Sequence, residues 1–401
     1  MISAPRVIQR RKLALASRKI TAISSSRADF AHLIWPMRSM ASHPGLDPEI
    51  LLFGAHLSPE FGHTGSAAAQ AGFTVRAELE CLVSSDTDVG MAKTIGLATL
   101  SLADELSRNR PDLVLLIADR YEMLAAASVA LALRIPIAHI EGGEISAGAI
   151  DDAVRNALTK MAHLHLTPHD NASRRVIAMG EEPWRVSTVG APSLDALNHT
   201  TLINPQAVTA QLALPEGKPV VIAWHPLTLA SDTNSESDAL FAALDSLSGH
   251  YRGPLVFCFP NADAGSRQII QRAQQWCEQR SNARLFTNLE PTQYFSLLSM
   301  ATAIVGNSSS GIMESASFKL PCVNIGRRQE GRLMAPNIID VDADVDAIIT
   351  AMQRALSADF CGQLNGLTNP YGDGQAGEAI AKILASAPDT TTLLRKVPCV
   401  V

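Results

Sequence analysis

The chain has 401 residues, of which 47% are hydrophobic and 18% charged, and its formal net charge is −6 at pH 7. This length exceeds one ordinary hydrophobic core, so two domains are expected. The acidic balance argues against a nucleic-acid-binding protein, and no apolar run reaches the roughly 18 residues that span a bilayer. The six cysteines form no CxxC pair, which favours reduced thiols and a cytoplasmic location.

Residues 1–17 form a basic N-terminal extension, interpreted as a loose tail because it lacks the long apolar segment of a targeting peptide. Beyond it, short apolar runs alternate with helical patterns, which indicates parallel βαβ units. Strands are predicted at 19–24, 50–53, 113–118, 137–140, 163–166 and 186–189. Helices are predicted at 91–108, 123–133, 151–161 and 171–179.

The pattern restarts after a polar stretch, 198–217, that contains two prolines. Strands are predicted at 220–224, 255–259, 284–286, 303–305 and 322–325. Helices are predicted at 237–247, 267–279, 292–300, 311–317 and 345–356. We therefore expect two doubly wound α/β domains, 18–197 and 198–373, with a C-terminal segment, 374–401. Such domains place a ligand at the carboxyl ends of their strands, in the crevice between them.

Two polar motifs follow predicted strands of the first half. The motif at 24–29, SSSRAD, offers hydroxyls, N–H groups and a guanidinium that suit phosphate binding. The alternative is an ordinary polar turn in which Asp29 lies near a helix start. The motif at 119–122, DRYE, follows a buried strand at the position where this fold binds ligands. Its alternative is an Asp–Arg pair that caps the next helix.

Carboxylates cluster in the next two motifs. The segment 139–144, HIEGGE, places Glu141 and Glu144 beside an imidazole at a strand end. Paired carboxylates in one cleft can have their pKa values driven apart, which yields one acid and one base. Asp151 and Arg155 lie four residues apart on a predicted helix and share a face; taken alone, they predict a surface salt bridge.

The second half adds a histidine, an asparagine and a serine-rich turn. His225 directly follows the predicted strand 220–224, and an ordinary histidine pKa suits proton transfer near neutrality. Asn261 lies in a polar loop and is a candidate nucleotide contact, although neighbouring side chains there could merely cap a helix. The segment 306–314, GNSSSGIME, offers hydroxyls and N–H groups at a helix start for a diphosphate, and its glutamate could bind ribose hydroxyls. Residues 327–332, RRQEGR, add positive charge for the same ligand.

Several familiar motifs are absent from the sequence: the P-loop, a strand-linked GxGxxG, HExxH and GxSxG. His163, His165 and His169 are interpreted as incidental histidines of a strand and loop. We therefore predict no metal and no cofactor, NAD included.

In combination, the motifs resemble the hydrolysing UDP-N-acetylglucosamine 2-epimerases of sialic-acid-type pathways. The resemblance runs from about residue 20 to 384 and rests on the segments 26–29, 119–120, 139–155, 159–163, 225–226, 261–266, 306–311, 328–332 and 371–374. It implies the glycosyltransferase-B fold, in which two Rossmann-like domains enclose a deep cleft. It also implies that a helix near 378–384 returns to the first domain, and that the protein is a homodimer or a homotetramer.

The resemblance assigns site residues position by position. Catalytic positions correspond to Asp119, Glu141, Asp151, Arg155 and His225, with Asp152 as a neighbour. Substrate-binding positions correspond to Arg27, Asp29, Arg120, Asn261, Ser308, Ser309, Glu314 and Arg328. Among these, the two serines would bind phosphate, the glutamate would bind ribose, and Arg328 would lie near the nucleotide.

The implied reaction converts UDP-N-acetylglucosamine and water into UDP and N-acetylmannosamine. A carboxylate removes the C2 proton while UDP leaves from C1; water then adds to the glycal-like intermediate, and a proton returns to the other face of C2. Glu141 and Asp119 are the candidates for the C2 proton, with His225 at the leaving group. No nucleic-acid or membrane partner is expected.

Three alternatives remain open. The same chemistry could act on UDP-2,4-diacetamido-2,4,6-trideoxyglucose, a non-hydrolysing epimerase would keep UDP attached, and a non-catalytic UDP-sugar sensor would bind without turnover. The intact acidic residues argue against the sensor. Two positions depart from the family pattern and bear on substrate or rate: Ala118 stands where the family usually has glycine, and Asn156 where it often has histidine.

Overall fold

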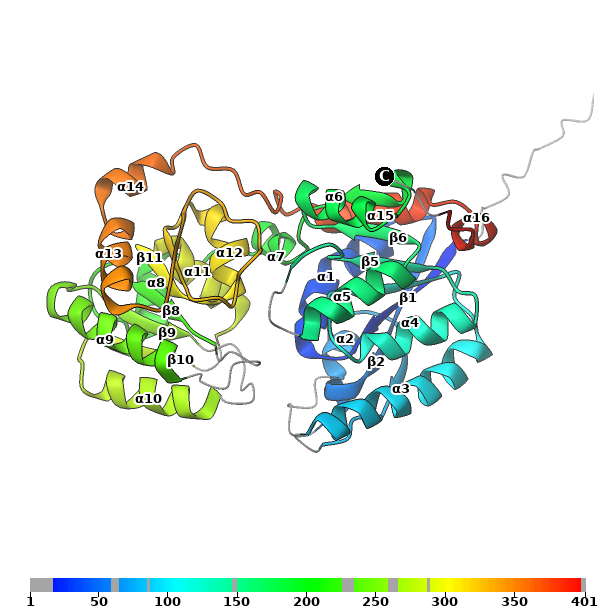
Figure 1. Ribbon diagram of the computed structural model, residues 1–401, viewed down its shortest axis with the longest axis horizontal. Coiled ribbons are helices and arrows are strands. Elements are labelled where there is room, and N and C mark those ends of the chain that lie inside the picture. The colour runs from blue at the N-terminus through cyan, green and yellow to red at the C-terminus, as the bar shows by residue number, and fades with distance from the viewer. Residues whose placement is uncertain are drawn as a thin grey trace, which may run out of the picture.

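Two parallel β-sheets with helices packed against their faces make up the computed structural model (Figure 1). The structure describes residues 17–58, 65–84, 87–145, 150–225, 234–258, 266–286 and 289–397. The strand order is β3-β2-β1-β4-β5-β6-β7 in the first sheet and β10-β9-β8-β11-β12-β13 in the second. The predicted fold class, two doubly wound α/β domains, is confirmed.

The strands follow the predicted apolar runs with shifts of a few residues. The first sheet contains β1 (Arg18–Ser24), β2 (Leu46–Phe53), β3 (Val75–Leu79), β4 (Leu113–Ile117), β5 (Ile137–Ile140), β6 (Leu164–Thr167) and β7 (Val186–Thr188). The second contains β8 (Val220–Ala223), β9 (Leu255–Cys258), β10 (Ala283–Phe286), β11 (Ala303–Gly306), β12 (Cys322–Ile325) and β13 (Ile338–Val341). The sequence analysis missed β3 and β13, because these edge strands are only partly buried and carry no continuous apolar run.

The helices divide between the two domains. The first carries α1 (Arg27–Ala41), α2 (Ser66–Gln70), α3 (Asp88–Arg108), α4 (Met123–Ala132), α5 (Ile150–Met161) and α6 (Asp170–Ala178). Next come α7 (Ser193–His199), α8 (Pro205–Gln211), α9 (Asn234–His250), α10 (Ser266–Glu278), α11 (Pro291–Met300), α12 (Ser309–Met313), α13 (Val345–Ala355) and α14 (Ala358–Gln363). The C-terminal pair is α15 (Ala376–Ser386) and α16 (Thr390–Leu394). The unpredicted α8 lies within the stretch 198–217, which was expected to be a polar connection.

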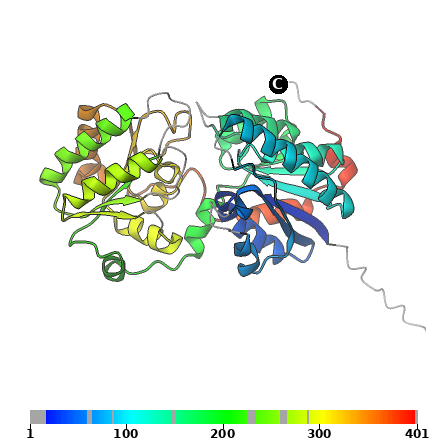
Figure 2. The ribbon, with the colours of Figure 1, turned by 90° about the horizontal axis from the view of Figure 1, so that it is seen from below.

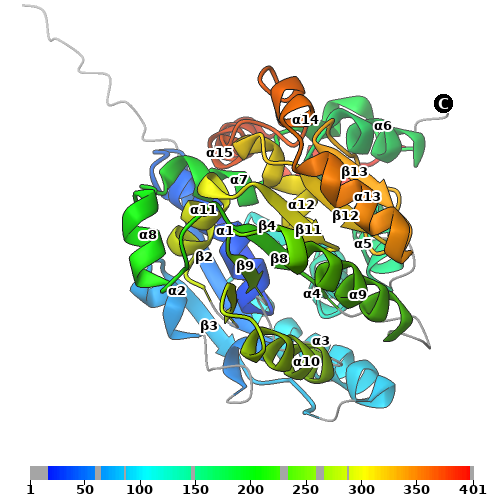
Figure 3. The same cartoon turned by 90° about the vertical axis from the view of Figure 1, so that its left-hand side faces the viewer.

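Alternation along the strands builds a core on each face of each sheet. In the first sheet, Ile20 packs with α1 and α15, whereas Ile23 packs with α3, α4 and α5. In the second sheet, Ile222 packs with α9, α10 and α13, and Val221 packs with α8 and α11. Figure 3 shows these two helix groups on opposite sides of the second sheet. Central strands buried on both faces explain the uninterrupted apolar run at 113–117.

The chain crosses between the domains twice, and the two crossings touch. The Ala191 N–H donates to the Tyr371 carbonyl at 2.8 Å. Gly190 and Gly372 have φ values of 90° and 112°, and a Cβ built on Gly372 would lie 3.1 Å from the Gly190 Cα. After the second crossing, α15 packs against α1, so the C-terminal helices lie with the first domain (Figure 2).

Over the described part of the chain, no helix combines the length and the apolar character that crossing a membrane requires.

Candidate active site

Strands β4 and β5 end side by side and begin the site. Ile117 lies opposite Ile140 in the parallel register, so Ala118 and Glu141 follow at the same edge of the sheet. Both residues have left-handed backbone, with φ values of 60° and 64°. Non-glycine residues avoid this region because their Cβ crowds the backbone. The fold therefore imposes a sharp turn on the first residue after each of the two strands.

An ion pair joins the first turn to α5. Arg155 Nη2 donates to Asp119 Oδ2, and Arg155 is only 3% exposed. Burial raises the pKa of Asp119, with Asp151 and Glu141 adding to the rise and Arg155 opposing it. Burial also raises the pKa of Asp151, against the attraction of Arg155. The surface salt bridge that the 151–155 spacing suggested by itself is therefore wrong, because Arg155 is buried and reaches across to Asp119.

Glu141 has a partner that the sequence analysis missed. His32 Nδ1 lies 3.3 Å from Glu141 Oε1, so a helix-α1 side chain meets the turn after β5. Burial alone would lower the pKa of His32, but Glu141 raises it to about 9. Burial by itself would raise the pKa of the Glu141 carboxyl. The positive charges of His32, Arg155 and Arg332 outweigh burial and lower this pKa. Glu141 is therefore an ionised carboxylate, whereas Asp119 is shifted toward its protonated form.

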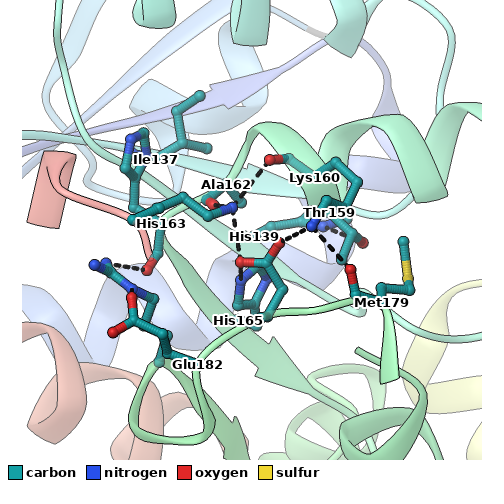
Figure 4. A network of polar contacts seen from close by, with 12 residues as sticks. Ile137, His139, Thr159, Lys160, Ala162, His163, His165, Met179 and Glu182 are labelled. Atoms are coloured by element: carbon teal, nitrogen blue, oxygen red, sulfur yellow. Dashed lines mark hydrogen bonds and ion pairs between the residues drawn. The ribbon is translucent and has the colours of Figure 1, made fainter. Parts of the chain in front are cut away.

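A network of polar side chains lies around β5, β6 and the end of α5 (Figure 4). His139 Nε2 lies 2.8 Å from the Ala118 carbonyl, and burial lowers the pKa of His139 to about 4, so a neutral imidazole donates this bond. His165 lies 3.1 Å from Glu181, which also binds Lys160 at 2.6 Å. Lys396 binds the same carboxylate at 2.7 Å, which ties the C-terminal segment to β6.

The other two neighbouring histidines also have protein partners. His163 Nδ1 accepts the Ile137 N–H at 3.1 Å. His169 Nε2 lies 3.2 Å from Glu144 Oε2, and His169 also caps α6. In the described residues, no group of three or more His, Cys, Asp or Glu side chains could hold a metal ion. These histidines thus order the loops around the strand ends.

The serine turn at 24–26 is held by the acidic residue expected to bind substrate. Asp29 Oδ2 accepts the Ser25 N–H at 2.9 Å and the Ser25 hydroxyl at 2.7 Å, and Ser26 caps α1. Asp29 is buried and orders this turn, and its role as a substrate contact stays a prediction. Arg27 lies exposed at the first position of α1. Arg120 binds the fully buried Glu122 at 3.0 Å.

In the second domain, Asn307 clamps the backbone of His225. Its side chain accepts the His225 N–H at 2.7 Å and donates to the His225 carbonyl at 2.8 Å. The Asn307 carbonyl in turn accepts Arg328 at 2.9 Å and Gln329 at 2.8 Å. Burial and Arg328 lower the pKa of His225 to about 3. The expectation of a near-neutral pKa is therefore wrong, because this buried ring faces a guanidinium.

The serine-rich turn begins a helix shorter than predicted. Ser308 caps α12 by accepting the Ser310 N–H at 3.3 Å, and the partly exposed Ser309 is the first helical residue. The helix ends at Met313, and a 3₁₀ turn, η4 (Ser315–Phe318), follows. Glu314 lies at this junction rather than in the first turns of a long helix. Burial raises its pKa, opposed by a hydrogen bond to Ser310 and by His32.

The site residues of the first domain lie opposite the segment 327–332 of the second domain. Gly331 has a φ of 85°, and a Cβ there would lie 2.6 Å from Ile145 Cγ2 of the first domain. Arg332 acts electrostatically on Asp119 and Glu141, so this cation from the second domain faces the carboxylates of the first. The motif 327–332 thus places positive charge near the acidic cluster, Asp119 and Glu141, as well as at the turn that contains Asn307.

Two predicted positions need separate comment. Asn261 lies outside the described residues. Asn156 Nδ2 donates to Asp152 Oδ2 at 3.1 Å, so both residues are engaged on one side of α5.

A surface cavity of about 610 Å³, lined by Lys218 and Met300 among others, lies at the amino ends of the second sheet's strands. It is thus at the opposite edge from the residues described above.

Known proteins are similar in sequence to this chain over most of its length. The family model described as UDP-N-acetylglucosamine 2-epimerase matches residues 38–385. A Campylobacter jejuni protein, GDP/UDP-N,N'-diacetylbacillosamine 2-epimerase (hydrolyzing), is 36% identical over 86% of this chain and 89% of its own length. The Legionella pneumophila UDP-N,N'-diacetylbacillosamine 2-epimerase (hydrolyzing) is 31% identical over 94% and 98%. A Neisseria meningitidis UDP-N-acetylglucosamine 2-epimerase is 30% identical over 85% and 88%.

The fold has solved counterparts. A crystal structure of UDP-GlcNAc 2-epimerase from Neisseria meningitidis bound to UDP-GlcNAc superimposes with a TM-score of 0.79, at 17% identity, over 91% of this chain and 99% of that one. This likeness supports the shared two-domain architecture.

Proposed function

Because this chain belongs to the UDP-N-acetylglucosamine 2-epimerase family, we propose that it is a hydrolysing 2-epimerase of a UDP-amino sugar. The observation that carries the mechanism is the contrast between two neighbouring carboxyl groups. His32 lies 3.3 Å from Glu141 and favours its ionised form, whereas burial raises the pKa of Asp119. Two carboxyls driven apart in this way suit a base and an acid.

In the first step, the Glu141 carboxylate removes the C2 proton of the sugar. The electron pair of that C–H bond forms the C1–C2 double bond, and the bond from C1 to the diphosphate oxygen breaks. UDP leaves with the electron pair of the broken C1–O bond and is stabilised by the second-domain groups, Ser308, Ser309 and Arg328. These cationic and N–H-rich surroundings stabilise the negative charge that builds up on the departing oxygen.

In the second step, water adds to C1 of the glycal-like intermediate, and Asp119 delivers a proton to the opposite face of C2. Arg155 stabilises the Asp119 carboxylate that remains. The proton that the water loses on addition then restores the Asp119 acid, and the proton on Glu141 passes to solvent. The balance is UDP-sugar plus water giving UDP, a released proton and the free 2-epimer. Asp151, also near Arg155, is the second candidate for proton delivery or for activating the water. His225 is neutral near pH 7, so its part at the leaving group is that of a hydrogen-bonding ring.

For the substrate, we favour UDP-N,N'-diacetylbacillosamine, the 2,4-diacetamido-2,4,6-trideoxy sugar nucleotide. The reported identities of 36% and 31% to relatives named for this substrate exceed the 30% to the meningococcal UDP-N-acetylglucosamine 2-epimerase. UDP-N-acetylglucosamine, which the resemblance placed first, is the second candidate, supported by the description of the family model.

Proton NMR of the purified protein with each nucleotide sugar in deuterated water tests the proposal. We expect free UDP and a free 2-epimer with deuterium at C2, and a kcat/KM at least tenfold higher for the diacetamido substrate. The Glu141→Gln variant should lose turnover and keep UDP binding. A 2-epimer that still carries UDP would rule out hydrolysis, and UDP binding without any turnover would support a sensor.

A further inference from the structure

We propose that His32 is a positioning residue that holds the Glu141 carboxylate in its ionised, aligned state. The proposal deepens the proposed function and rests on it for its kinetic part. His32 lies on α1 three residues after Asp29, so the two side chains are on the same face of the helix. Its Nδ1 is 3.3 Å from Glu141 Oε1. The two residues are 109 positions apart, so only the fold joins them.

The surroundings of His32 favour a cation. Carboxyl groups face it from three elements: Asp29 on its own helix, Glu141 after β5, and Glu314 at the end of α12. Glu141 accepts its hydrogen bond, and the field of all three carboxyls outweighs the cost of burial, so the pKa of His32 rises to about 9. Near neutral pH, His32 therefore donates Nδ1–H to Glu141 as an imidazolium.

This cation acts on the reacting carboxylate without touching the reacting atoms. The other charged groups that face Glu141 are Arg155 on α5, Arg332 in the second domain and Asp119 after β4. Arg155 is already paired with Asp119. His32 is thus the hydrogen-bonding cation of Glu141, and it fixes which oxygen remains available to a proton on the sugar.

His32 also interacts electrostatically with Glu314, the proposed ribose ligand. Its charge lowers the pKa of Glu314, whereas burial raises it. If Glu314 binds ribose hydroxyls, an ionised Glu314 accepts their hydrogen bonds better than a neutral one. One cation then acts on the proposed base and on the proposed ribose ligand.

The kinetic test compares His32→Gln with His32→Lys and with the control His43→Gln, a histidine just beyond the end of α1. Loss of the cation raises the pKa of Glu141, so the acid limb of the kcat/KM profile should move up by about one pH unit in His32→Gln. Well below that limb we expect kcat/KM to fall about tenfold, as a shift of one pH unit requires, with UDP affinity changing less than fivefold. The His32→Lys variant should restore the acid limb of the kcat/KM profile to its wild-type position, and the profile of His43→Gln should match that of wild type.

A second readout needs no turnover. The His32 imidazole, assigned by its absence in His32→Gln, is titrated by NMR in the wild type and in Glu141→Gln. Loss of the carboxylate should lower the pKa of His32 by at least one pH unit. An unchanged titration, or a His32→Gln acid limb that coincides with wild type, overturns the proposal. An inert wild type with the expected titration shift would contradict the proposed function alone and leave the His32–Glu141 pairing standing.

Discussion

Ala118 and Glu141 occupy equivalent positions after neighbouring strands, and both have left-handed backbone, at φ 60° and 64°. The pair sets the edge on which the acidic cluster is built, because Asp119 follows the first turn and Glu141 is itself the second. Ala118 is also the position where the resembled family usually has glycine. The structure supplies a physical reason for that preference, since glycine adopts positive φ without a Cβ penalty.

We expect Ala118→Gly to stabilise the protein by about 1 kcal/mol, because relief of the left-handed strain exceeds the entropy that glycine adds to the unfolded chain. Denaturant unfolding measures the difference. Ala126→Gly, in the buried interior of α4, is the matched control and should destabilise by about 1 kcal/mol. Equal losses in both variants would contradict a strained turn at Ala118.

Removing one partner of the Asp119–Arg155 pair leaves the other buried charge uncompensated. Arg155→Met should therefore destabilise by about 3 kcal/mol, and Asp119→Asn by at least as much, because Asp119 left alone can take up a proton whereas the buried Arg155 cannot lose its charge. The double variant should recover part of the stability but none of the activity. Unfolding free energies and initial rates of all four proteins form the cycle. Strict additivity of the two stability losses would show that the pair is not coupled.

Asn307 should control UDP affinity through the backbone of His225. Asn307→Ala leaves the buried His225 N–H and carbonyl without their side-chain partner, so we expect the Kd for UDP to rise at least tenfold. The control is Asn324→Ala, which removes a 2.7 Å bond from a similarly buried asparagine to Asp340. Calorimetric titration with UDP should show a change below twofold for the control.

The stability of the first domain should fall in acid because of Glu181. Its pKa is lowered to about 2, with burial opposing the bonds from His165, Lys160 and Lys396. A depressed pKa contributes stability above the unfolded value of 4.5, and this contribution is lost as the pH falls toward 2. We expect Glu181→Gln to cost on the order of 2–3 kcal/mol at pH 7.

Unfolding measured between pH 3 and pH 7 checks this, because the difference between Glu181→Gln and wild type should shrink steadily below pH 4.5. Glu378→Gln is the control. Glu378 pairs with Lys382 at 3.4 Å on the exposed face of α15, and its loss should change stability by less than about 0.5 kcal/mol at any pH. A pH-independent difference for Glu181→Gln would contradict the shifted pKa.

Much of the architecture could be predicted because its signals are local. Apolar runs such as 113–117 identify strands that are buried on both faces, and the motifs at their ends identify the edge where a ligand is expected. Prediction was poorer at β3 and β13, whose half-exposed residues resemble those of loops. It also failed for the 151–155 pair, since helical spacing cannot show that Arg155 reaches a different strand end.

The sequence by itself determined the two α/β sheets, the acidic and serine-rich turns, and the family resemblance, because each is encoded by residues close together in the chain. Only the tertiary structure decided which charges meet. The parallel order of β1, β4 and β5 brings α1 against the turn after β5 and so joins His32 to Glu141. This packing places the His32 charge that separates the pKa of Glu141 from that of Asp119, and burial within the second domain makes His225 neutral. Such effects depend on distance and desolvation, which sequence spacing does not contain.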